Sequence, residues 1–234
     1  MSMPPDRRVV SVSPLGPLRP ELPVWGLFGR GLLVVLGHIL IVPSPWTSTS
    51  FYRFLTERIA LPDGRRLKFA GQPGDIWYAF IAFSVLTWLH PSLDRSGLPQ
   101  AFGLALMLAS WALMVLILKW FCTNVRSEDG RLSLSFEGGY WAYIGWNILL
   151  IVSFVTIVGW AWVAKYMAQW ICRNVRGTLS FDFTATGWEI LWRTLVFLLA
   201  SMLVIPIPWM IHWYADWMIS QISVIQPGAA VATA

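Results

Sequence analysis

Long apolar stretches alternate with short polar segments along this chain. The apolar stretches cover residues 24–46, 76–90, 101–122, 140–172 and 188–225. A helix needs about 20 residues to cross the hydrocarbon core of a bilayer, and the last two stretches are too long for one straight span. They are interrupted at Gly159 and at Pro206, so each is expected to turn back on itself. The pattern predicts an α-helical polytopic membrane protein with internal repeats.

Three polar segments between the helical stretches, residues 58–71, 124–139 and 174–187, predict short β-hairpins. Apolar and polar residues alternate in each, which is typical of a strand with one apolar face. The first two segments contain the dipeptides Asp63-Gly64 and Asp129-Gly130. Asp-Gly favours a tight hairpin turn because glycine accepts the positive φ that the turn requires. The hairpins are expected between helical units, where they could pair with one another into a small sheet.

Aromatic residues recur at a regular spacing in four segments. The paired anchors are Trp46 and Phe54, Trp111 and Trp120, Trp162 and Trp170, and Trp209 and Trp217. Four residues after each second anchor the chain has a polar residue: Arg58, Asn124, Asn174 or Gln221. This agreement predicts an internal repeat. Its structural anchors are Trp46, Trp111, Trp120, Trp162, Trp170, Trp209, Trp217, Asn124 and Asn174, which we expect to hold each unit at the membrane interface.

The repeat predicts one transmembrane domain over residues 24–225, built from four units. The units cover about residues 24–71, 75–139, 140–187 and 188–225, with a disordered basic arm at 1–23 and a disordered tail at 226–234. If each unit is a helix pair that runs down and back, the hairpins, both termini and nearly every Lys and Arg share one side. Five single spans would divide the basic residues almost evenly. The tendency of basic residues to stay in the cytoplasm favours the paired arrangement, in which some returning arms are re-entrant or interfacial.

Composition agrees with this interpretation. The chain is 56% hydrophobic and 12% charged, whereas soluble domains carry about 25% charged residues. It has 16 Trp residues, and Trp is favoured where one edge of the ring meets hydrocarbon and its N–H meets water. The net charge of +5 is spread over the loops between apolar stretches, which indicates contact with anionic headgroups. No nucleic-acid partner is predicted.

Two stretches carry a resemblance to a known family. Residues 154–183 read FVTIVGWAWVAKYMAQWICRNVRGTLSFDF, and residues 51–71 read FYRFLTERIALPDGRRLKFAG. The order of apolar helix, break, aromatic helix ending in Asn, and short hairpin ending in F-x-G resembles the YjgN-like family of bacterial inner-membrane proteins of unknown function. The resemblance covers about two thirds of the chain, which is short for the family and has only Lys165 where a basic run is expected. It implies a bacterial inner membrane and carries over no catalytic residue.

No catalytic, cofactor-binding or metal site is predicted. His38, His90 and His212 lack the spacing of ligands that converge on a metal ion. Cys122 and Cys172 occupy the same position of the repeat, which favours two buried thiols over a bridge.

Two pairs of side chains spaced four residues apart are weaker functional candidates. They are Glu189 with Arg193, and His212 with Asp216. Ionisable groups inside an apolar helix are costly and often mark a functional site. The alternative is a local ion pair or hydrogen bond near the interface.

Two functions from different classes agree with these features. The first is a non-enzymatic scaffold or accessory subunit of a membrane complex, which contacts the lipid bilayer and membrane-protein partners through Trp-rich faces and hairpins. The alternative is a transporter or channel component for a small solute, because repeats and broken helices are features of transporters. In either case we expect a multi-pass protein of the bacterial inner membrane, with hairpins and termini in the cytoplasm.

Overall fold

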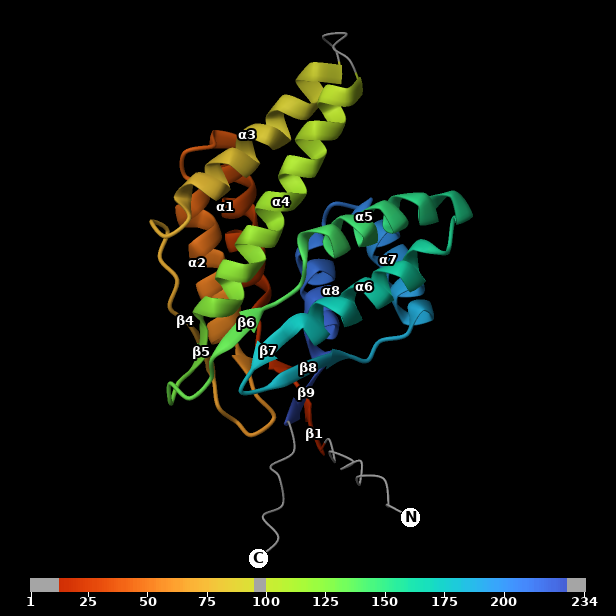
Figure 1. Cartoon of the computed structure of the whole chain (residues 1–234). Helices are drawn as coiled ribbons and strands as arrows, with labels where there is room; N and C mark the ends of the chain where they lie inside the picture. The colour runs from red at the N-terminus through yellow and green to blue at the C-terminus, as the bar shows by residue number, and fades with distance from the viewer. Residues whose placement is uncertain (1–12, 95–99, 227–234) are drawn as a thin grey trace, which may run out of the picture.

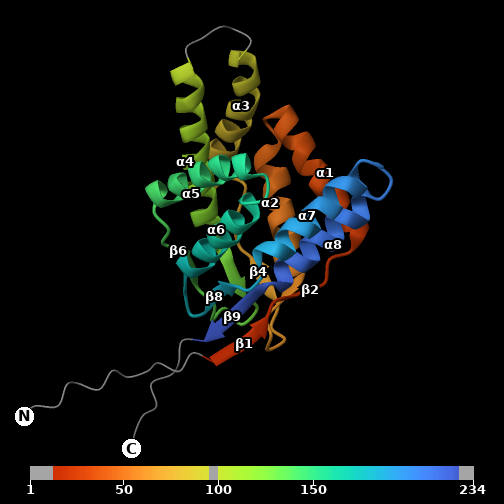
Figure 2. The same ribbon diagram turned by 90° about the vertical axis from the view of Figure 1, so that its right-hand side faces the viewer.

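The computed structural model describes residues 13–94 and 100–226, and its helices come in antiparallel pairs (Figure 1). The pairs are α1 (Val24–Leu40) with α2 (Ser44–Glu57), α3 (Trp77–Asp94) with α4 (Gln100–Asn124), α5 (Tyr140–Ser153) with α6 (Trp160–Asn174), and α7 (Gly187–Ser201) with α8 (Ile207–Ser220). A 3-10 turn, η1 (Phe154–Thr156), follows α5. Strands gather at one end of the molecule, and the helix pairs extend away from that end (Figures 1 and 2).

Helix length overturns the prediction of a polytopic membrane protein. Among the described helices, only the segment Ala101–Asn124 is both long enough and apolar enough to cross a membrane. The 14 residues of α5 extend about 21 Å at about 1.5 Å per residue, against a hydrocarbon core about 30 Å thick. The two longest apolar stretches, residues 140–172 and 188–225, are each divided by a turn into two helices of 14 or 15 residues. The prediction of an α-helical polytopic protein with multiple spans is therefore wrong, and the chain has a mixed helix-and-strand fold.

The β-hairpin prediction is also wrong. The described strands are β1 (Ser13–Pro17), β2 (Arg19–Pro20), β3 (Ile59–Ala60), β4 (Leu67–Phe69), β5 (Val125–Ser127), β6 (Leu134–Phe136), β7 (Val175–Gly177), β8 (Ser180–Phe183) and β9 (Ile222–Gln226). Gly64 and Gly130 do take the positive φ of a tight turn. The strands on either side of each turn nevertheless pair elsewhere, with one isolated bridge between Ala60 and Arg66.

Each helix pair is instead closed by two strands, one before its first helix and one after its second. The antiparallel pairs are β2 with β3, β4 with β5, β6 with β7, and β8 with β9. The described residues thus form four strand–helix–helix–strand modules, at residues 19–60, 67–127, 134–177 and 180–226. Each polar segment contributes its first strand to one module and its second strand to the next. Apolar side chains that the sequence assigned to a local hairpin therefore pack against a distant strand.

The recurring polar position lies where the second helix of each module becomes a strand. In each module, the backbone carbonyl at this position accepts a hydrogen bond from the backbone N–H of the residue that follows the first strand. The bonds run from Glu21 to Arg58 (2.8 Å), from Ala70 to Asn124 (2.9 Å), from Glu137 to Asn174 (2.9 Å) and from Thr184 to Gln221 (3.0 Å). The amide side chains of Asn124 and Asn174 donate to the carbonyls of Trp120 and Trp170. Asn suits a helix end because its side chain satisfies a carbonyl that has lost its helical partner.

The N-terminal segment joins the first module to the last. β1 pairs with β9, the Leu18 N–H donates to the Ile222 carbonyl over 2.9 Å, and β2 pairs with β3. The sequence predicted a disordered arm over residues 1–23, whereas residues 13–20 form these strands; residues 1–12 lie outside the described part. The predicted disordered tail begins at Gln226, which ends β9, and residues 227–234 also lie outside the described part.

In modules two and three, aromatic rings pack against a glycine that follows the first strand. Phe69 meets Trp120 edge to face at 5.2 Å, and Phe136 meets Trp170 at 5.8 Å. A Cβ atom at Gly71 would lie 2.6 Å from Trp120 Cζ2, and one at Gly138 would lie 2.9 Å from Trp170 Cη2. The F-x-G motif is thus a packing requirement, because these rings occupy the space of a side chain.

The neighbouring residues Gly138 and Gly139 allow a matched test of this packing. Gly138→Ala is expected to lower the free energy of unfolding by about 1–3 kcal/mol, because the core must move to admit a methyl group. Gly139→Ala serves as the control, since nothing lies within 4 Å of its Cβ position. Thermal unfolding followed by circular dichroism measures both. Equal melting temperatures for the two variants would show that the rings do not require glycine.

Candidate functional site

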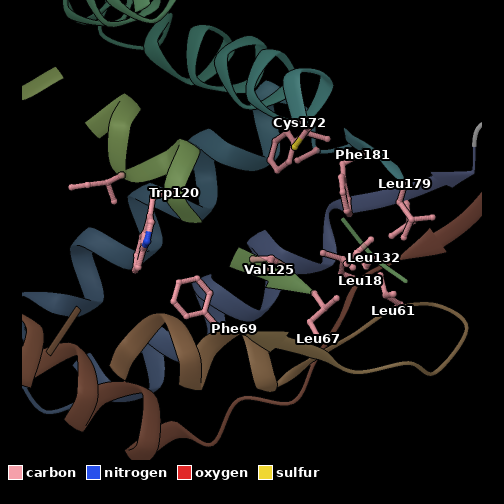
Figure 3. Packing of buried hydrophobic residues seen from close by; sticks show 14 of the residues in the cluster. Leu18, Leu61, Leu67, Phe69, Trp120, Val125, Leu132, Cys172, Leu179 and Phe181 are labelled. Atoms are coloured by element: carbon pink, nitrogen blue, oxygen red, sulfur yellow. The ribbon is translucent and has the colours of Figure 1, made fainter. Parts of the chain in front are cut away.

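A cavity of about 280 Å³ lies where the four modules meet. The side chains that line it come from the ends of α2, α4, α6 and α8 and from the strands that pair below them. Figure 3 shows five of them (Leu18, Leu67, Val125, Cys172 and Phe181) converging from different elements. The cavity is therefore a product of the whole fold, since no single module encloses it.

The lining repeats the same three positions in each module. A position near the end of the second helix supplies Thr56, Cys122, Cys172 and Ile219. The second strand supplies Ile59, Val125, Val175 and Ile222, and the first strand or the residue before it supplies Leu18, Leu67, Leu134 and Phe181. Leu55, Leu118, Phe121 and Ile171 complete the wall. The modules are thus arranged around a common centre, and the cavity occupies that centre.

The cavity wall offers no free polar group among these residues. Thr56 carries its only hydroxyl, which donates to the Tyr52 carbonyl over 2.8 Å. Burial raises the pKa of Cys122 to about 11 and that of Cys172 to about 12. Both cysteines are free and buried, as predicted. At neutral pH the thiols are protonated, so they act as small apolar groups in the cavity wall and react only slowly with electrophiles.

An apolar pocket that is partly open to solvent leaves hydrocarbon surface in contact with water when it is empty. Transfer of such surface from water to an apolar partner is favourable by about 25 cal/mol per Å². The chemistry of the wall therefore favours a hydrocarbon occupant.

The predicted aromatic anchors divide into two groups. Trp46, Trp162 and Trp209 are exposed and lie near the turns between paired helices. Trp120 and Trp217 are buried at the strand end, while Trp111 and Trp170 are half-buried. The sequence placed all of these residues at a membrane interface, but the second anchors lie in or beside the protein core. The cavity lining was not identified from the sequence, although the matched residues Thr56, Cys122, Cys172 and Ile219 were a signal for it.

The Glu189–Arg193 candidate pair does not form an ion pair in the described part of the chain. Glu189 instead closes a capping box at the start of α7: its carboxylate accepts from the Thr186 N–H over 2.8 Å, and its own N–H donates to Thr186 Oγ1. The guanidinium of Arg193 lies over the rings of Trp192, Trp213 and Trp217, at 4.8, 5.4 and 4.5 Å from their centroids. Glu189 thus caps the N-terminus of helix α7, and Arg193 makes cation–π contacts.

The second candidate pair, His212 and Asp216, lies half-buried on α8. Within residues 13–94 and 100–226 no hydrogen bond or ion pair joins the two side chains. His38, which the sequence did not support as a metal ligand, has more polar contacts: its Nδ1 lies 2.7 Å from Ser84 Oγ, and its Nε2 lies 3.4 Å from Ser48 Oγ. Burial lowers the pKa of His38, so its neutral imidazole joins α1, α2 and α3.

Comparison of the chain with protein-family models, with curated proteins and with solved structures finds no match. The resemblance to the YjgN-like family stays a prediction.

The capping role of Glu189 predicts a pH-dependent stability difference. The hydrogen bonds from Thr186 hold the pKa of Glu189 below its usual value, so the ionised carboxylate stabilises the folded state above the unfolded pKa of about 4.3. This stabilisation is lost as the pH falls through the lower, folded pKa. Glu189→Gln should therefore lower the free energy of unfolding at pH 7 by about 0.3–1 kcal/mol. In acid, the difference between the variant and the wild type should disappear. Thr186→Ala should destabilise at both pH values, because the Thr186 hydroxyl accepts from a backbone N–H that does not titrate. A constant difference between Glu189→Gln and wild type would exclude the cap.

Proposed function

We propose that this protein is a non-enzymatic scaffold or accessory subunit that binds one face of a lipid bilayer. In this arrangement the turns between paired helices enter a single leaflet, and the strand end remains in water. The observation that carries the proposal is the chemistry of three turns, between α1 and α2, between α5 and α6, and between α7 and α8.

These turns are apolar and highly exposed. Residues 39–48, 152–160 and 200–209 contain no Asp, Glu, Lys or Arg. At the second and third turns Val155, Ile157 and Ile205 are 83%, 80% and 82% exposed. Contiguous exposed apolar surface is a common mark of contact with a membrane or another protein. The turns lie at the ends of the helix pairs that are remote from the strands (Figures 1 and 2).

The backbone at these turns has the same strained form in all three. Ile41, Ile157 and Val204 have φ of 64°, 64° and 58°. Around each, an N–H donates to the carbonyl two residues earlier, from Val42, Val158 and Ile205, over 2.8, 2.7 and 2.6 Å. A γ-turn with positive φ is rare, and a branched side chain there costs about 1–3 kcal/mol. Glycine would remove that cost, so the apolar side chains at these sites support a use for apolar surface.

Helix length and the distribution of charge support insertion into one leaflet. Helices of 14–17 residues around these turns extend about 21–26 Å, which is less than the full core of about 30 Å and more than half of it. Exposed Trp46, Trp162 and Trp209 lie close to the turns, where indole N–H groups would meet headgroups.

The strand end is charged. Ion pairs there include Lys68 with Glu128 at 3.5 Å and Arg176 with Glu137 at 3.2 Å. Charged groups of this kind are stable in water, so the two ends of the molecule suit different solvents.

Placing charge at the turns tests the proposal. Val155→Asp with Ile205→Asp should reduce partitioning into phosphatidylcholine–phosphatidylglycerol vesicles at least tenfold, because a carboxylate is costly in hydrocarbon. Both positions are exposed, so the fold should persist. The matched control, Ser133→Asp with Thr178→Asp, adds the same charge at exposed sites of the strand end and should bind as wild type does. Vesicle flotation measures both, and undiminished flotation of the turn variant would reject the proposal.

Cysteine labelling tests whether the turns stop within the membrane. In protein bound to sealed vesicles, Ser133→Cys should react with a membrane-impermeant maleimide added outside. Leu203→Cys should react from neither side. Reaction of Leu203→Cys only with reagent trapped inside the vesicles would show that the turn crosses the bilayer, contrary to the proposal.

A further inference from the structure

We infer that the central cavity is a binding site for a single alkyl chain, such as the tail of a lipid or of a free fatty acid. The inference is independent of the proposed membrane attachment, since the cavity lies at the strand end and the inserted turns lie at the opposite end of the helix pairs. It depends on the composition, size and accessibility of the cavity.

Composition excludes polar occupants. Four modules each contribute three positions to the wall, and these positions hold aliphatic side chains, Phe181, two protonated thiols and the one hydroxyl of Thr56, which is already bonded. A polar ligand, or a cluster of water molecules, needs two or more hydrogen-bonding partners at such a site. The wall supplies only van der Waals contacts, which alkyl groups can use fully.

Size favours a chain over a small hydrocarbon. An engineered apolar cavity of about 150 Å³ remains dry and takes up benzene. The cavity here is about 280 Å³, so it can hold an apolar group roughly twice as large. A medium-length alkyl chain meets this requirement and adapts to a wall made of branched side chains.

Accessibility allows a ligand to enter. The cavity is not fully enclosed, and half-buried side chains line it from all four modules, among them Leu55, Phe121, Val175 and Ile222. An alkyl chain that entered past these residues would leave its polar head outside, in contact with solvent.

The two thiols provide a local readout in purified protein outside any bilayer, at mildly alkaline pH, where a larger fraction of each thiol is ionised. Alkylation of Cys122 and Cys172 by N-ethylmaleimide, followed by mass spectrometry, should be slowed by 1-alkanols from hexanol to decanol. The concentration that halves the rate should fall about fourfold for each added methylene, as expected for burial of one CH₂, until the cavity is full. Rates that no alkanol alters, or that fall without dependence on chain length, would overturn the inference.

A substitution that fills the cavity with a larger side chain should prevent the protein from binding the alkyl ligand. Val175→Phe places a larger side chain in the cavity wall, and Ser133→Phe adds the same ring at an exposed position outside the wall as a control. Organic extraction of the purified wild type and of Ser133→Phe should yield about one alkyl compound per chain, and Val175→Phe should yield less than one tenth of that. If Val175→Phe does not fold, Cys172→Leu serves as the milder variant. Equal yields from filled and control variants would reject the site.

The extracted compound identifies the source of the chain. A phospholipid would assign the site to a bilayer lipid, and a free fatty acid would assign it to a soluble alkyl ligand. The turn variant, Val155→Asp with Ile205→Asp, should retain the compound after purification while losing vesicle binding. Failure of the site and failure of membrane attachment are therefore separate outcomes. An empty cavity with unprotected thiols would leave the attachment proposal intact and eliminate this one.

Discussion

The pairing of one strand before each helix pair with one strand after it is the interaction on which the fold depends. Helices of 14–17 residues are marginal by themselves, and strands of two to five residues are weaker still. The ladder fixes both ends of a helix pair at the same place, and the backbone bond to the carbonyl of Arg58, Asn124, Asn174 or Gln221 marks the junction. Each element thus gains its stability from partners distant in sequence.

The polar segments connect each module to the next. Because one segment supplies the last strand of one module and the first strand of the next, adjacent modules are joined by only a short stretch of chain between their ladders. The N-terminal segment closes the remaining gap, since β1 pairs with the last module and β2 with the first. Four similar modules held in this way direct the same three side-chain positions towards a common centre. A cavity there follows from geometry, because equivalent aliphatic side chains approach the centre from several directions without meeting at it.

The opposite ends of the helix pairs carry a different chemistry. There, branched residues occupy strained turns and expose apolar surface, whereas the strand end carries ion pairs such as Lys68 with Glu128. Between these ends, α2 packs through small polar residues: Ser44, Ser48 and Thr49 are almost wholly buried. The His38 imidazole satisfies two serine hydroxyls in this region. Ser44 donates to the Ile41 carbonyl and Ser48 contacts His38, so their burial is compensated, whereas the Thr49 hydroxyl is buried without a hydrogen-bond partner among the described residues.

The sequence by itself determined local features. Proline and glycine marked where apolar stretches turn back, Asp-Gly marked positive φ at Gly64 and Gly130, and the repeat placed Cys122 and Cys172 at equivalent sites. Helix length was misjudged because hydropathy counts apolar residues without regard to where the chain reverses. The interface role of Trp120 was misplaced for a related reason: a ring that suits an interface also suits a core, and only its neighbours distinguish the two. Glu189 could satisfy Arg193 or the start of α7, and the geometry of Thr186 decided between them.

Only the tertiary structure decided which strands pair. A strand of three residues carries too little information to specify a partner, and the local hairpin and the distant ladder satisfy the same alternation of apolar and polar side chains. The distant partner wins because it also closes a helix pair and buries Phe69 against Trp120 and Phe136 against Trp170. The central cavity was decided in the same way, since its wall is assembled from all four modules and exists in none of them alone.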